Sequence, residues 1–351
     1  MNSAPSAPET WLVGDIGATH ARFGLVSPDA KLLHSRTLSD EDYPTIEDAL
    51  SAFLAERSES PMPRQGAIAI ASAITGDRVA MTNHPWSFSV QELKARFAFE
   101  RFEVINDFTA LALALPRLAP EDRQAVGGGA AVAGAPLGVL GPGSGLGVSG
   151  LVPCGNGWIA LTGEGGHATM AAATDREGAV LDHMRQHFDH VSAERALSGP
   201  GLVNLYNTLA VIDGVPAKAY TAAQITELAI RAEDPLCVET TTMFCAMLGT
   251  MAGNLALTLG ARGGVYIGGG IVPRLGQTFL DSPFRERFEA KGRQTREVHP
   301  VPALDRLTVA CRGAVGVTPH LDSGSRLARK KVPTIDMIFM VSIQPGDTLR
   351  K

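Results

Sequence analysis

The sequence predicts an α/β protein built from two halves of like topology. Two separate stretches each contain three short strands joined by glycine-bearing or polar turns, and each is followed by helical segments and an apolar strand. The chain has 351 residues, of which 45% are hydrophobic and 19% charged, enough to bury a large core and to form about two domains. We therefore expect two α/β domains, related by a weak internal duplication, with a cleft between them.

The first half begins with three strands in residues 10–39. A glycine-bearing turn at Asp15–Thr19 separates the first two strands, and a Pro-Asp turn at 28–29 separates the next two. The apolar segment GAIAIASAI predicts a fourth strand. The segment YPTIEDALSAFLAE lies between the third and fourth strands. It predicts a helix with one apolar stripe formed by Ile46, Ala49, Leu50, Phe53 and Leu54.

The second half repeats this order. Residues 136–166 read as strand, glycine-rich turn, strand, Gly-Asn-Gly turn and strand. Helices are expected in REGAVLDHMRQHF and in the long apolar segment TMFCAMLGTMAGNLALTL. The strand in GGVYIGGG then closes on Gly268–Gly270.

Composition narrows the function classes. The net charge of -5 and pI near 6.0 argue against a nucleic-acid binder, which normally carries a basic face. The four cysteines are scattered without a C-x-x-C pair, which disfavours a disulfide scaffold or zinc ribbon and favours a reducing compartment. Residues 1–10 read as a disordered lead, and no run approaches the ~20 apolar residues of a membrane span. We expect a cytoplasmic protein.

Glycines stand where strands join in both halves. A hairpin without Cβ atoms can aim backbone N–H groups at a phosphate and let the anion approach closely. The alternative is a tight hairpin that needs positive φ and binds nothing. Two such hairpins and the cluster Gly268–Gly270 together favour a nucleotide site. Neither a P-loop motif nor a dinucleotide fingerprint is present, since these glycines join strands.

Several motifs follow one another in order between Trp11 and Leu321, namely LVGDIGATHARFGL, AIASAITGD, MTNHPWSFS, VINDFTALA, GPGSGLGV, GEGGH, VSAERALSGPGLVNLY and GGVYIGGGIVPR. Together they resemble bacterial glucokinases, the hexokinase-like branch of the actin-type sugar kinases. The resemblance implies a two-domain actin/ribonuclease H-like fold with mixed sheets flanked by helices, and an active site in the interdomain cleft. It implies a small domain of residues 11–117 plus about 308–325, a large domain of 118–307, and a tail of unknown role from Arg326.

The implied reaction is transfer of the ATP γ-phosphoryl group to the 6-hydroxyl of D-glucose, giving glucose 6-phosphate and ADP. The cofactors are ATP and Mg²⁺, with Asp15 contacting the metal through water. Asn106 and Asp107 would face the reacting hydroxyl, and Glu164, His167 and Glu194 would hold the other sugar hydroxyls. The implied nucleotide-binding residues are Gly14, Asp15, Ile16, Gly17, Ala18 and Thr19 in the first hairpin, Gly143, Ser144 and Gly145 in the second, and Gly269 and Gly270 beside the adenosine.

Other interpretations of these residues stay open. Asp107 can orient the hydroxyl and accept its proton, or it can cap the helix beginning near Phe108. Glu194 can instead be an exposed acidic residue at a helix start. Kinases of the related ROK group place a Glu and a His beside a cysteine cluster that binds zinc, but no such cluster accompanies His167 here.

The sequence also departs from the family pattern. The chain has Gly17-Ala18-Thr19-His20 where the family usually has Gly-Gly-Thr-Asn, so Ala18 replaces a glycine that tolerates positive φ. Ser144 keeps the hydroxyl of the usual threonine. Expected partners are glucose, ATP and a second copy of the chain in a homodimer, with neither nucleic acid nor membrane. The alternatives are a kinase for another hexose, a phosphoanhydride hydrolase, or a non-catalytic sugar-sensing regulator.

Overall fold

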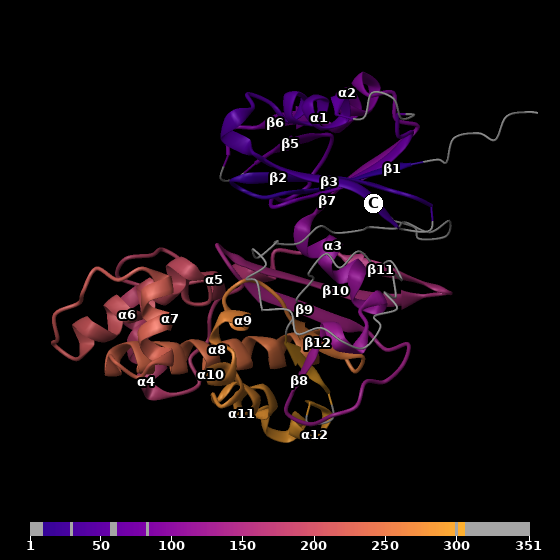
Figure 1. The fold of residues 1–351 in the computed structure, drawn as a ribbon. Coiled ribbons are helices and arrows are strands. Elements are labelled where there is room, and N and C mark those ends of the chain that lie inside the picture. Colours follow the sequence, from indigo (N-terminus) through magenta and orange to yellow (C-terminus); the bar gives the residue numbers. More distant parts are fainter. Residues whose placement is uncertain (1–9, 29–30, 57–61, 82–83, 299–300, 306–351) are drawn as a thin grey trace, which may run out of the picture. The chain divides into compact units, whose positions relative to one another are not determined.

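The computed structural model describes residues 10–28, 31–56, 62–81, 84–298 and 301–305, which divide into two compact units after Ala114 (Figure 1). We expected a boundary after residue 117. The lead, the expected return of residues 308–325 to the first domain and the tail from Arg326 lie outside the described residues, apart from Thr10. The expected cleft stays a prediction, and each unit is described by itself.

The first unit is built on a five-stranded sheet in the order β3-β2-β1-β4-β7. Its strands are β1 (Trp11–Ile16), β2 (His20–Val26), β3 (Leu32–Ser39), β4 (Gln65–Ile70) and β7 (Arg101–Asn106). The first three strands form an antiparallel meander, and β4 and β7 continue the sheet parallel to β1. The register aligns Ile16, Ile70 and Asn106, so the three parallel strands end at one edge.

Figure 1 shows two helices on the same side of this sheet, α1 (Ile46–Ala55) and α2 (Val90–Arg96). Thr45 caps α1 by accepting a hydrogen bond from the Asp48 N–H, and the expected stripe of five apolar residues is buried, which confirms that prediction. The unit also contains the helix α3 (Asp107–Ala114), the turn η1 (Asp40–Asp42) and a small hairpin of β5 (Arg78–Ala80) and β6 (Ser87–Ser89).

The second unit is built on a six-stranded sheet in the order β11-β10-β9-β12-β13-β8. Its strands are β8 (Gln124–Val126), β9 (Leu137–Pro142), β10 (Leu146–Cys154), β11 (Gly157–Leu161), β12 (Gly264–Ile267) and β13 (Ala303–Asp305). Strands β9, β10 and β11 form an antiparallel meander, and β12 and β13 run parallel to β9. These five strands repeat the order and directions of the first sheet, which confirms the predicted duplication and the mixed sheets, and β8 adds an antiparallel strand beside β13.

Helix α8 (Pro235–Leu259) is the central helix of the second unit, where it packs against β9, β12, α6, α7 and α11. By length and composition it could cross a membrane, but 56% of its most apolar window is buried, as in a core helix. The other helices are α4 (Asp175–Met184), α5 (Ala193–Ala196), α6 (Gly199–Ile212), α7 (Ala222–Ile230), α9 (Val272–Leu275), α10 (Gln277–Leu280), α11 (Phe284–Glu289) and α12 (Thr295–Val298). Short 3-10 turns lie at η2 (Leu115–Arg117), η3 (Pro120–Asp122), η4 (Gly165–His167) and η5 (Gly292–Gln294).

Candidate active site

The first glycine hairpin joins β1 to β2 at residues 17–19. The Gly17 N–H donates a hydrogen bond to the His20 carbonyl oxygen at 3.0 Å. Neither Gly17 nor Ala18 has a φ in the left-handed region, so alanine at position 18 introduces no backbone strain. No hydrogen bond between described residues uses the Ala18 N–H. This hairpin therefore keeps a backbone donor for an anion, although the family glycine is missing.

Gly14 and Ile16 can reach a nucleotide only through their backbone atoms. A Cβ atom on Gly14 would lie 2.6 Å from Ile68 Cγ2, so the glycine is needed to let β1 and β4 pack. Ile16 is fully buried in the apolar core of the first unit. Packing alone therefore accounts for glycine at position 14, and a contact of its backbone with a nucleotide stays a prediction.

Asp15 lies at the base of the first hairpin and is 7% exposed. Arg22 faces it across the β1–β2 ladder, and Arg22 Nη1 donates to Asp15 Oδ2 at 3.1 Å. A carboxylate at the base of a hairpin with open backbone donors suits Mg²⁺, which keeps several of its waters when it binds beside phosphates. Within the described part of the chain, no three His, Cys, Asp or Glu side chains are grouped to hold a metal ion.

Asn106 and Asp107 stand at the same sheet edge as the first hairpin, where β7 passes into α3. Asn106 Oδ1 accepts hydrogen bonds from the N–H groups of Phe108 (2.9 Å) and Thr109 (3.2 Å), which is the geometry of a helix N-cap. Asn106 Nδ2 donates to Asp107 Oδ1 at 3.0 Å and to the Ser72 carbonyl oxygen at 3.3 Å. Asn106 therefore caps the helix and orients the Asp107 carboxylate, although Asp107 Oδ1 also accepts from the Phe108 N–H at 2.9 Å.

The second glycine hairpin joins β9 to β10 and is closed by a 2.8 Å hydrogen bond from the Gly143 N–H to the Gly145 carbonyl oxygen. Neither of these glycines has a φ in the left-handed region, whereas Gly155, in the turn between β10 and β11, has φ +57°. The interpretation that glycine serves a tight turn therefore applies to Gly155 and not to the hairpin at 143–145. No hydrogen bond between described residues uses the Ser144 N–H.

The third glycine cluster follows β12 and lies against the second hairpin. Gly269 has φ +80°, and a Cβ atom there would lie 2.3 Å from the carbonyl oxygen of Pro142, the residue before Gly143. The Gly268 N–H donates to the Leu140 carbonyl oxygen at 2.8 Å. Gly270 faces open space. The fold thus brings together glycines that are far apart in the sequence.

Glu164 and His167 flank a turn whose backbone lies directly on β10. A Cβ atom on Gly165 would lie 2.8 Å from Val148 Cγ1, and one on Gly166 would lie 2.0 Å from the Leu146 carbonyl oxygen. The side chains of Glu164 and His167 are exposed and make no hydrogen bond to any described residue. The glycines therefore fix the turn, and the two polar side chains remain available to a ligand.

Glu194 lies in α5, which contacts the turn that contains His167. The Ala193 N–H donates to the Ala168 carbonyl oxygen at 2.8 Å, and the Leu146 N–H donates to Glu194 Oε2 at 2.8 Å. Glu194 is half-buried, so it is not the exposed helix-start residue of the alternative interpretation. The second unit thus gathers the second hairpin, Gly269 and the three expected sugar-binding residues.

Asp40 lies beside the first hairpin and was not among the residues predicted from the sequence. It is fully buried, its N–H donates to the Thr19 carbonyl oxygen at 3.0 Å, and neither carboxylate oxygen has a well-formed hydrogen bond among described residues. Burial raises the pKa of Asp40 to about 6, and this rise is opposed by the positive charges of His84, His20 and Arg22 and by the Ala21 N–H. Its Asp-Glu-Asp context reads as exposed surface, so no sequence signal indicated it.

Comparison with known proteins shows which family the chain resembles over most of its length. The family model described as Glucokinase matches residues 12–317. A glucokinase from Paramagnetospirillum magneticum is 52% identical over 303 residues, covering 84% of this chain and 94% of that protein. A glucokinase from Aromatoleum aromaticum is 51% identical over 292 residues, covering 83% of this chain and 88% of that protein.

A solved structure agrees over a similar span. The crystal structure of a glucokinase from an Antarctic psychrotroph superposes with a TM-score of 0.78 at 38% identity. The superposition covers 85% of this chain and 94% of that one. Residues 12–317, which the family model matches, include both glycine hairpins, the Asn106–Asp107 pair and the three residues expected to hold the other sugar hydroxyls.

Proposed function

The chain belongs to the glucokinase family, and from this premise we propose which of its residues carry out the family's reaction. The chain is an ATP-dependent hexose kinase that transfers the γ-phosphoryl group of ATP to the 6-hydroxyl of D-glucose. Phosphoryl transfer needs mainly positioning and charge stabilisation, together with a carboxylate that orients the attacking hydroxyl and accepts its proton. We assign that carboxylate to Asp107.

The cap at Asn106 is the observation that carries this assignment. Because the amide of Asn106 accepts from the N–H groups of Phe108 and Thr109, helix α3 does not depend on the Asp107 carboxylate as its cap. Asn106 also donates to Asp107 Oδ1, which fixes the direction of the carboxylate. As the sugar O6 bonds to the γ-phosphorus, its proton passes to Asp107, and the bond from the γ-phosphorus to the bridging oxygen of ADP breaks.

Glu164, His167 and Glu194 are proposed to bind the other sugar hydroxyls. Several fixed donors and acceptors reject a sugar with an inverted hydroxyl, because one of them is then left unpaired. The side chains of Glu164 and His167 are exposed and form no hydrogen bond within the described part of the chain, which supports this role.

The backbone donors of the two glycine hairpins are proposed to receive the phosphates of ATP, with Gly269 and Gly270 beside the adenosine. Asp15 is the residue that would hold Mg²⁺ through water. The metal, when bound, neutralises charge on the phosphates.

Asp107→Asn tests the catalytic assignment. Asparagine keeps the shape of the side chain but removes the base, so turnover should fall by roughly 10² to 10⁴. Glucose binding and the melting temperature should change little, because Asn106 holds the cap. Asp175→Asn, at the first position of α4, is the matched control and should leave turnover unchanged. Near-normal turnover of Asp107→Asn at saturating ATP and glucose contradicts the assignment.

An ADP-release assay across glucose, mannose, fructose and N-acetylglucosamine tests the sugar. Glucose should give the highest kcat/KM. Faster turnover of another hexose would favour the first alternative, and glucose binding without ADP release would favour a sugar-sensing regulator. ADP release without any sugar would favour the hydrolase.

The homodimer is proposed on the family resemblance alone. Light scattering during size-exclusion chromatography should give twice the 36.9 kDa chain mass. A single-chain mass across the working concentration range contradicts it.

A further inference from the structure

One carboxylate links the expected sugar site to the second phosphate hairpin. Glu194 Oε2 accepts the Leu146 N–H at 2.8 Å, and Leu146 directly follows the hairpin residues 143–145. A Cβ atom on Gly145 would lie 2.5 Å from the same oxygen, so the carboxylate rests against the hairpin backbone. A side chain at position 145 would therefore have to displace this carboxylate.

The segment 194–199, which contains Glu194, holds the hairpin at a second point. The Gly199 N–H donates to the Gly143 carbonyl oxygen at 2.8 Å, and the Gly143 N–H donates to the Gly145 carbonyl oxygen at 2.8 Å. Ser198 Oγ donates to the Glu194 carbonyl oxygen at 2.8 Å and so ties α5 to the start of α6. The hairpin and the segment 194–199 therefore form a closed ring of hydrogen bonds in the second unit.

We propose that Glu194 is a positioning residue for the second phosphate hairpin, and that it couples sugar binding to nucleotide binding. With Oε2 on the Leu146 N–H, the hairpin is held in one arrangement. A sugar hydroxyl bound to the same carboxylate prevents the Glu194 side chain from adopting other rotamers, so the hairpin stays in the arrangement that binds the nucleotide. Glucose therefore strengthens nucleotide binding. By linkage, the nucleotide strengthens glucose binding by the same factor. Both parts rest on the proposed function: the positioning role on the assignment of residues 143–145 to the phosphates, and the coupling also on the assignment of Glu194 to the sugar.

The first test measures nucleotide binding in the absence of sugar. Calorimetry with Mg²⁺ and a non-hydrolysable ATP analogue should give a Kd on the order of 5-fold weaker for Glu194→Ala than for the unmodified chain. Glu194→Gln keeps an acceptor oxygen for the Leu146 N–H and should restore the Kd. His167→Ala, which removes another expected sugar contact, should leave this Kd unchanged. A Glu194→Ala chain that unfolds near its normal temperature and binds the analogue normally overturns the proposal.

The second test measures glucose binding in the absence of nucleotide. Gly145→Ala displaces the carboxylate and should weaken glucose binding on the order of 5-fold, although position 145 belongs to the phosphate hairpin. Gly143→Ala is the matched change, since its Cβ meets nothing within 4 Å, and it should leave the glucose Kd unchanged. Equal glucose affinity of the two hairpin variants overturns the coupling.

The glucose affinity of Glu194→Ala shows whether only the coupling fails or the proposed function fails as well. If it binds glucose normally, then Glu194 is not a sugar ligand and the proposed function fails at that residue. If it binds glucose weakly while Gly145→Ala binds it normally, only the coupling fails.

Discussion

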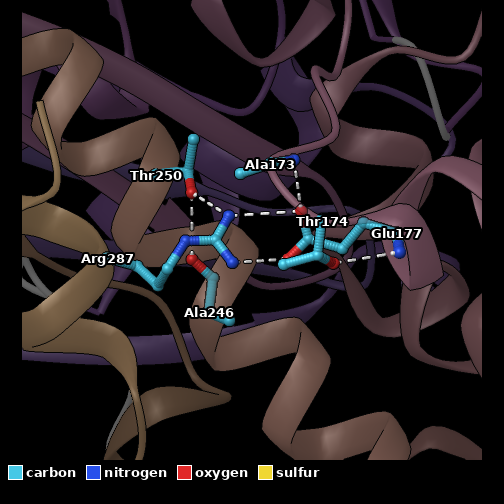
Figure 2. A network of polar contacts seen from close by, with 6 residues as sticks. All are labelled: Ala173, Thr174, Glu177, Ala246, Thr250 and Arg287. Atoms are coloured by element: carbon cyan, nitrogen blue, oxygen red, sulfur yellow. Dashed lines mark hydrogen bonds and ion pairs between the residues drawn. The ribbon is translucent and has the colours of Figure 1, made fainter. Parts of the chain in front are cut away.

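Asp40 in the first unit and Glu177 in the second are both buried carboxylates, with exposed fractions of 0% and 3%, but their surroundings are opposite. Glu177 accepts hydrogen bonds from Arg287 Nη1 at 2.7 Å, from Arg287 Nη2 at 3.2 Å and from the Ala173 N–H at 2.7 Å (Figure 2). Arg287 Nη2 also donates to Thr250 Oγ1 at 2.8 Å. Neither oxygen of Asp40 has a comparable partner among the described residues.

The difference separates two kinds of buried carboxylate. Hydrogen bonds hold Glu177 in place, whereas the burial of Asp40 works against its ionised form. The Glu177 network joins three helices, α4, α8 and α11, and its charge is balanced by Arg287. Asp40 lies beside the first glycine hairpin, where burial outweighs the opposing effects of the Ala21 N–H and the nearby basic side chains and disfavours the charged form of the carboxylate. Burial alone therefore does not tell what a carboxylate does. Its hydrogen-bond partners do.

The largest expected change in the free energy of unfolding is that of a substitution at Glu177. Glu177→Ala leaves the Arg287 guanidinium, which is 14% exposed, without its counter-charge, and should cost about 3 to 5 kcal/mol of unfolding free energy. Urea denaturation with a shared m-value measures the loss.

Glu239→Ala is the control for that measurement. Glu239 pairs with Arg176, the neighbour of Glu177, but both side chains are more than a third exposed. The loss should be about 0 to 1 kcal/mol. Equal losses in the two variants would remove the distinction between a buried and an exposed pair.

Asp40→Asn should instead increase the free energy of unfolding. The native state holds the Asp40 proton more tightly than the unfolded chain, so this proton adds stability below pH 3.8 that is lost as the pH rises to about 6. Asparagine cannot ionise, so the variant should gain on the order of 2 kcal/mol above pH 6 relative to the unmodified chain. Melting temperatures of both proteins at pH 5 and pH 7.5 measure the gain, which should be larger at pH 7.5.

Asp213→Asn is the contrasting variant. A hydrogen bond from Arg176 lowers the pKa of Asp213, so its contribution is present above pH 3.8 and is lost as the pH falls below that value. This variant should lose stability at neutral pH. The interpretation of Asp40 fails if Asp40→Asn and Asp213→Asn change stability in the same direction at pH 7.5.

Local patterns predicted much of this fold. Glycine turns and short apolar runs indicated both meanders, and the apolar stripe of α1 is buried as expected, because periodicity reports which face of an element packs. The start of α8 was missed. We expected it at Thr242, whereas Asp234 caps the helix and Pro235 occupies its first position. That cap followed by proline is a recognisable start signal, but the polar run at residues 239–242 interrupts the apolar period after the first turn.

Long-range contacts could not be predicted in this way. The bond from the Leu146 N–H to Glu194 joins residues 48 positions apart, and nothing near either residue indicates it. The burial of Asp40 likewise depends on the hairpin that it contacts through Thr19. Motif resemblance identified the residue types of the candidate site, whereas the carboxylate beside Gly145 and the cap at Asn106 required the fold.

Within the Glu177 network, the smallest predicted effect concerns Thr250, which contributes one hydrogen bond to Arg287. Thr250→Val keeps the shape and β-branching of the side chain but removes the acceptor of Arg287 Nη2. Arg287 keeps both contacts with Glu177, and the Thr250 carbonyl oxygen still accepts from Lys291 Nζ, so the loss should be only about 1 kcal/mol. Thr242→Val is the matched control, because that exposed hydroxyl in the same helix also donates to the carbonyl four residues before it but forms no hydrogen bond with Arg287. Urea denaturation of the two variants isolates the contact with Arg287. A Thr250→Val loss as large as that of Glu177→Ala would mean that the hydroxyl, rather than the carboxylate, holds Arg287 in place.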